Sequence, residues 1–110
     1  MEITTRQEKD ATVVMVQGRI DAVTAPEFEN HLSSLIEKGG RRFIINLGGL
    51  EYISSAGLRS ILSTAKRLKA EQGDIRFSGL QGPVEEVFKI SGFYSIFKIF
   101  DSDASALNDV

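Results

Sequence analysis

The chain has 110 residues, of which 42% are hydrophobic and 25% charged, with a formal net charge of -2 and no cysteine. This length suits one domain with a single core. The small net charge provides no basic surface for bulk binding to nucleic acid or anionic membrane, and the lack of cysteine excludes disulfides, thiol catalysis and zinc–thiolate sites. No apolar run approaches the roughly 18 residues of a membrane span, and the N-terminus lacks an apolar signal segment. We therefore expect one cytoplasmic domain over residues 1–110.

Strand patterns and a helix start occupy the first third of the chain. Residues 2–8 alternate weakly between apolar and polar side chains, and residues 12–17 form a β-branched run, so both segments are predicted strands. A helix start follows. Thr24 is expected to cap this helix, with Val23 and Phe28 packed together as a hydrophobic staple.

A continuous apolar run at residues 42–47 predicts a strand that is covered on its faces. The next helix is predicted from about Ser55 to near Gly73, and Leu62 belongs to its expected apolar stripe. The remaining predicted elements are a strand at 75–78, a helix opening at 82–83, a strand at 96–100 and a terminal helix beginning at 101 or 102.

The order β-β-α-β-α-β-α-β-α predicts a single α/β domain. We expect a central mixed β-sheet of about four to five strands, packed with about four α-helices. Right-handed crossovers make most of the sheet parallel, so the first two strands are the expected antiparallel pair.

Two serines lie where the third predicted strand gives way to a helix, in the segment of residues 52–58. A helix start offers unpaired N–H groups and the positive end of the helix dipole, so a hydroxyl there can act as a cap or accept a phosphate. Capping is the ordinary role, but one cap needs only one of Ser54 and Ser55. Ala56 and Gly57 follow, and glycine in a first turn weakens a helix by about 1 kcal/mol relative to alanine. We expect these small residues to give a visiting molecule access to the hydroxyl, and packing of Gly57 against a neighbouring strand is the alternative.

Catalytic patterns are weak. Ser63 and Lys66 match S-x-x-K inside a regular amphipathic helix, and Ser55 has no G-x-S-x-G context. A serine hydrolase would require the single histidine, His31, to approach Ser55 from another helix, whereas a solvated His31 is the simpler expectation. No phosphate-binding or dinucleotide-binding glycine motif is present.

The segment Tyr-Ile-Ser-Ser-Ala-Gly-Leu at 52–58 resembles the signature D-S-[ST/A]-G-L of the STAS domain, specifically that of bacterial anti-sigma factor antagonists. Other segments resemble this family in the same order along nearly the whole chain. They are G-x-[LI]-D at 18–21, A-x-x-F-x-x-x-L at 25–32, G-L-x-G-x-V at 79–84 and the C-terminal strand and helix at 97–106.

The resemblance implies a non-enzymatic switch with no obligatory cofactor. When unphosphorylated, such a protein binds an anti-sigma factor that is also a GHKL-type serine kinase, and the sigma factor is released for transcription. A metal-dependent serine phosphatase resets the switch. Alignment on Gly57 and Leu58 makes Ser55 the implied phosphorylation site. The implied partner-binding residues are Asp21, Ser54, Ser55, Ala56, Gly57 and Arg59, on a protein expected to be a monomer or weak dimer.

Two departures from the signature leave alternatives open. Ser54 stands where many members have Asp, and Ala56 where they have Ser or Thr, so the role of an acidic neighbour is in question.

The same fold also serves as a scaffold in stress-sensing assemblies and as a regulatory subunit of lipid-transport ATPase complexes. A small serine hydrolase using Ser55 is the remote alternative.

Overall fold

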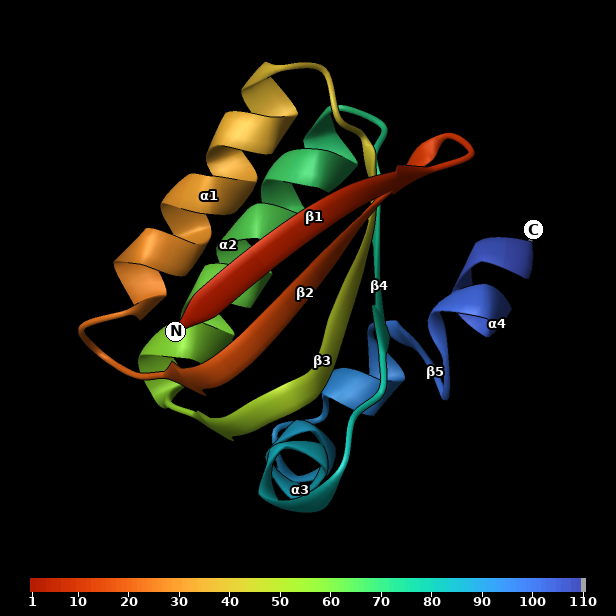
Figure 1. Ribbon diagram of the computed structural model, residues 1–110. Coiled ribbons are helices and arrows are strands. Elements are labelled where there is room, and N and C mark those ends of the chain that lie inside the picture. The colour runs from red at the N-terminus through yellow and green to blue at the C-terminus, as the bar shows by residue number, and fades with distance from the viewer. Residues whose placement is uncertain (110) are drawn as a thin grey trace.

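Five strands form one mixed sheet in the order β1-β2-β3-β4-β5 in the computed structural model, which describes residues 1–109 (Figure 1). β1 is antiparallel to β2 and the other neighbouring pairs are parallel, so the predicted mixed α/β fold is confirmed. None of the described helices has the length and apolar character needed to cross a membrane. The elements are β1 (Glu2–Glu8), β2 (Ala11–Ile20), α1 (Ala25–Glu37), β3 (Arg42–Ile53), α2 (Ser55–Ala70), β4 (Asp74–Ser78), α3 (Gly82–Ile90), a 3-10 turn (Phe93–Ser95), β5 (Lys98–Phe100) and α4 (Asp103–Asn108).

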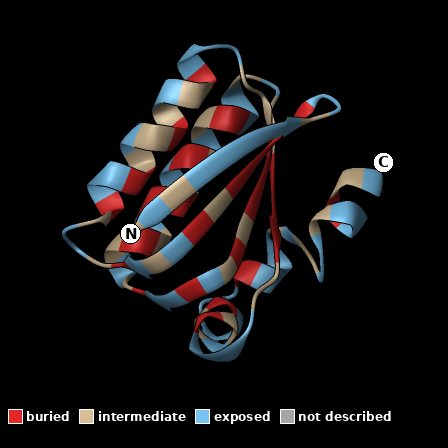
Figure 2. Cartoon of the chain, in the orientation of Figure 1, coloured by how far each residue is buried: buried red, intermediate tan, exposed pale blue. Residues whose placement is uncertain are grey.

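The helices divide unequally between the two faces of the sheet. Side chains of α1, α2 and α3 share the larger core with the sheet, and buried residues follow the facing sides of these elements (Figure 2). Within this core Phe77 of β4 meets Phe88 of α3 edge to face, with 5.3 Å between ring centroids. On the other face α4 covers a smaller cluster through Ala106, which is fully buried. α1 and α2 therefore lie side by side over the larger core.

Two strands are longer than the sequence indicates. β2 continues past Gly18, which has a φ of +100° beside an irregularity in the strand pairing, and ends at Ile20. β3 likewise runs on to Ile53, which is paired with Ile20. Backbone N–H of Ser54 then donates to the Ile20 carbonyl at 2.8 Å. This hydrogen bond links the ends of β2 and β3, which lie beneath the starts of α1 and α2.

The start of α1 differs from the expected cap and staple. Thr24 occupies the N-cap position, but its hydroxyl accepts from Asp21 N–H and donates to the Arg19 carbonyl. The predicted staple is wrong, because Val23 is 85% exposed while Phe28 is fully buried. The Asp21 side chain instead accepts from the N–H groups of Val23 and Thr24, in the turn that precedes the helix.

Candidate functional site

The two serines at the start of α2 have different surroundings. Ser54 is the N-cap, and its Oγ accepts from Gly57 N–H at 3.2 Å. Ser55 is the first residue of the helix and is exposed. In the described part of the chain its hydroxyl takes no hydrogen bond, and neither does its N–H or that of Ala56. The capping role therefore falls on Ser54, and Ser55 presents a free hydroxyl beside unpaired N–H donors.

The surroundings of Gly57 favour packing against the strands, rather than partner access, as the reason for a glycine at this position. The residue is buried, and a Cβ built on it would lie 2.7 Å from Ile20 Cγ2 and 2.7 Å from Ile53 Cγ1. Side chains cannot approach that closely without a shift of the surrounding core. Glycine lets the first turn of α2 rest directly on the paired ends of β2 and β3.

Asp21 anchors the neighbouring loop between β2 and α1. Its Oδ1 accepts from the N–H groups of Val23 and Thr24, each at 3.0 Å, and from the Thr24 hydroxyl at 3.1 Å. The hydrogen bond from Thr24 N–H is the largest of several effects that lower the pKa of Asp21, and the nearby charge of Arg19 acts in the same direction. The half-buried carboxylate therefore stays ionised and holds the loop that borders the serines.

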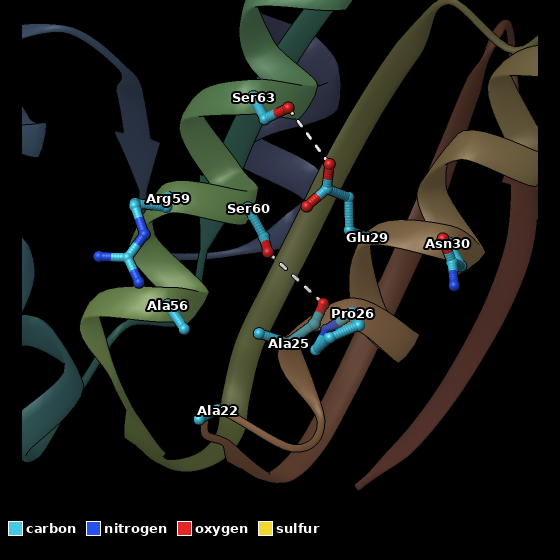
Figure 3. Close-up of a pocket in the computed structure, with 9 residues that line it drawn as sticks. All are labelled: Ala22, Ala25, Pro26, Glu29, Asn30, Ala56, Arg59, Ser60 and Ser63. Atoms are coloured by element: carbon cyan, nitrogen blue, oxygen red, sulfur yellow. Dashed lines mark hydrogen bonds between the residues drawn. The ribbon is translucent and has the colours of Figure 1, made fainter.

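A groove of about 490 Å³ separates the first halves of α1 and α2 (Figure 3). Ser60 and Thr64 are buried on α2, and small side chains there let the two helices approach closely, whereas Leu62 is 42% exposed and outside the expected stripe. The i, i+4 spacing of Ser60 and Thr64 is the sequence signal that could have indicated this groove. The lining residues are Ala22, Ala25, Pro26, Glu29, Asn30, Ala56, Arg59, Ser60 and Ser63.

Charged side chains border the groove. Glu29 Oε2 accepts from the Ser63 hydroxyl at 3.2 Å, so this carboxylate is tied to the opposite helix. Arg59 extends from α2 on the side away from Glu29 (Figure 3). Arg19, at the end of β2, lies over the ring of Tyr52 with 4.4 Å to its centroid. Polar, apolar and charged side chains therefore line the groove between α1 and α2.

The six predicted partner-binding residues differ in how far they are exposed to solvent. Ser55 and Arg59 are exposed, and Ala56 lines the groove between the helices. Asp21 and Ser54 are half-buried and hold backbone N–H groups, while Gly57 is buried. The structure brings all six to the end of the sheet where β2 and β3 terminate.

His31 forms no hydrogen bond with Ser55 among the described residues. Its Nε2 is buried without a hydrogen-bond partner, so the expectation of a solvated histidine is wrong for this atom. The structure provides no histidine positioned to activate the serine.

Known proteins with the same architecture share its sequence pattern. A protein of Bordetella bronchiseptica named as a candidate anti-sigma factor antagonist, BtrV, is 40% identical over 106 residues, which cover 96% of this chain and 91% of BtrV. The anti-sigma-B factor antagonist of Staphylococcus aureus is 29% identical over 87% of this chain and 88% of its own length. The crystal structure of an anti-sigma factor antagonist from Mycobacterium paratuberculosis superposes with a TM-score of 0.86 at 25% identity, over 96% of this chain and 90% of that one.

The family assignment follows from these likenesses and from the match of residues 2–106 to the STAS domain. The single mixed sheet, its helices and the serine-bearing start of α2 belong to that match. The chain is a member of the STAS domain family.

Proposed function

We propose that this protein is an anti-sigma factor antagonist whose binding is switched by phosphorylation of Ser55. Unphosphorylated, the face around the start of α2 binds an anti-sigma factor with GHKL-type serine kinase activity, and the sigma factor is released for transcription. The 40% identity with BtrV over nearly the whole chain carries this proposal. The free, exposed hydroxyl of Ser55 supports it.

In the proposed reaction the Ser55 Oγ attacks the γ-phosphate of ATP held by the partner. A bond forms between Oγ and phosphorus, the bond from phosphorus to the bridging oxygen breaks, ADP leaves, and a base of the partner accepts the hydroxyl proton. The protein itself acts as substrate and binding module, without a cofactor. A metal-dependent serine phosphatase hydrolyses the phosphoserine and restores the hydroxyl.

The switch requires little change in the fold. Phosphorylation adds a charge of about -1.5 to -2 at a helix start, where negative charge is favoured. At the interface the same charge must be desolvated against the partner, and each 1.4 kcal/mol of that cost weakens binding about tenfold. Phosphorylation therefore lowers affinity for the partner while the domain stays folded.

The test is phosphate incorporation from ATP in the presence of an anti-sigma kinase, with the site mapped by mass spectrometry. Ser55→Ala should abolish incorporation. Ser54→Ala should retain most of it, and Ser63→Ala, an exposed serine two turns along the same helix, serves as the matched control. Undiminished incorporation into Ser55→Ala would contradict the assignment.

A further inference from the structure

We propose that Arg59 is the intramolecular counter-charge of a phosphate on Ser55. Phosphorylation would then engage this cation at the modified serine, so that it is no longer available to the partner. The inference rests on the proposed function, because it concerns the same serine, and it adds a regulatory role for a second residue.

Helix geometry brings the two side chains together. Ser55 is the first residue of α2 and Arg59 lies four residues later, and both are exposed. Residues at this spacing are neighbours on a helix surface, with about 5–6 Å between Cβ atoms. Helical side chains also lean toward the N-terminus, so the guanidinium is directed over the first turn. An anion that precedes a cation by four residues is the favourable orientation of such a pair.

Arg59 is uncommitted before modification. In the part of the chain that the structure describes, it takes part in no hydrogen bond or ion pair, although it lines the groove between α1 and α2. Glu29, the carboxylate among the residues that line this groove, accepts from the Ser63 hydroxyl, and Arg59 extends on the side of α2 away from it (Figure 3). A new anion on Ser55 would therefore meet a cation with no ion pair to break.

Other charged groups around the serine already have partners. Arg19 lies over the Tyr52 ring, and the Asp21 carboxylate accepts from backbone N–H groups of its own loop. The guanidinium of Arg59 can supply two parallel donors to phosphate oxygens, a geometry that an ammonium group does not reproduce. Arg59 is therefore the cation best placed to pair with a phosphate on Ser55.

The test uses the full chain with phosphoserine incorporated at position 55 during translation, so no kinase is needed. The second ionisation of the phosphate is followed by phosphorus NMR at low salt. A neighbouring cation favours the dianion and lowers the phosphate pKa. Arg59→Gln should therefore move the titration midpoint to higher pH by at least about 0.3, the change expected for an exposed ion pair of a few tenths of a kcal/mol.

Two further variants separate a specific pair from the general field of the protein. In Arg59→Lys the midpoint should lie between those of wild type and Arg59→Gln, because lysine keeps the positive charge but loses the two parallel donors of the guanidinium. Lys66→Gln removes an exposed positive charge from the same helix, about 16 Å along its axis from Ser55, and should leave the midpoint unchanged. A midpoint unaffected by Arg59→Gln, or moved equally by Lys66→Gln, would overturn the proposal.

Failure of the proposed function has a different signature. If phosphorylation does not control partner binding, the phosphoserine protein binds the anti-sigma factor as tightly as the unmodified one, whatever the NMR midpoint. Addition of about 0.5 M salt should shrink the Arg59→Gln effect, because an exposed pair is screened. A shift that persists undiminished in high salt would contradict an ion pair at the surface.

Discussion

The starts of α1 and α2 lie side by side at one end of the sheet, yet they differ in the negative charge that surrounds them. Just before α1 the carboxylate of Asp21 accepts from the N–H groups of Val23 and Thr24, and Glu27 adds a second negative charge in the first turn of the helix. At α2 a neutral hydroxyl, that of Ser54, takes one N–H, and the first turn holds no acidic residue. The α1 start contains its own anion, whereas the α2 start leaves room for one.

The remaining helices resemble α1 in this respect. The first turns of α3 and α4 contain Glu85 and Asp103, so α2 is the exception among the four α-helices in the described part of the chain. Negative charge near a helix N-terminus is worth about 0.3–1 kcal/mol at exposed positions. A phosphate on Ser55 would give α2 the charge that the other helices obtain from carboxylates, which is why the modified domain is expected to remain folded.

The largest expected effect comes from Gly57→Ala, which tests what positions the α2 start. The added methyl would meet Ile20 and Ile53 at 2.7 Å, and overpacking of this kind costs about 1–3 kcal/mol. That cost should outweigh the gain in helix propensity of about 1 kcal/mol, so the free energy of unfolding should fall in urea titrations. Ser55→Ala, which adds no atom to the core, is the control. A stabilised Gly57→Ala variant would mean that the α2 start rests less tightly on the strands than the geometry indicates.

Periodicity predicted the element order, the mixed sheet and the two-serine helix start, because these depend on local patterns. It did not predict the extension of β3 to Ile53, since the continuous apolar run ends before the two glycines at 48–49. The sequence left the role of Gly57 open between partner access and packing against a strand, because the atoms it contacts come from the ends of two separate strands. Val23 read as a staple from spacing alone, but the loop held by Asp21 leaves it exposed. Long-range packing decided each of these cases.

The next largest effect distinguishes the two serines. Ser54→Ala removes the side-chain acceptor for Gly57 N–H and should lower the free energy of unfolding by about 1 kcal/mol, the usual value of an N-cap. Ser55→Ala should change it by less than about 0.5 kcal/mol, because the side chain is exposed and forms no described hydrogen bond. Thermal and urea unfolding of both variants measure the difference. Equal losses would show that the α2 start depends on both hydroxyls.

A smaller effect, of opposite sign, is expected for Ser55→Glu. The new carboxylate lies at the N-terminal end of α2 and should leave the melting temperature unchanged or raise stability by about 0.3–1 kcal/mol, while anti-sigma factor binding weakens at least tenfold. Val23→Glu is the matched control at the α1 start. There the exposed position adjoins Asp21, so repulsion should cancel any gain. A gain at Val23 equal to that at Ser55 would remove the distinction between the two helix starts.

The smallest effect is a pH dependence confined to the α1 start. Hydrogen bonds lower the pKa of Asp21 in the folded protein below its ordinary value of 3.8, so the carboxylate contributes stability above the unfolded pKa and loses it as the pH falls through the folded pKa. Asp21→Asn keeps an oxygen acceptor without the charge. Wild type should therefore be more stable than Asp21→Asn at about pH 7, and the difference should close below about pH 4. Because the pKa of Asp10 is also lowered, by its bond to Arg42, the informative quantity is the difference between the two proteins at each pH. A difference that stays constant down to about pH 2 would mean that the α1 start, like that of α2, is held by neutral hydrogen bonds alone.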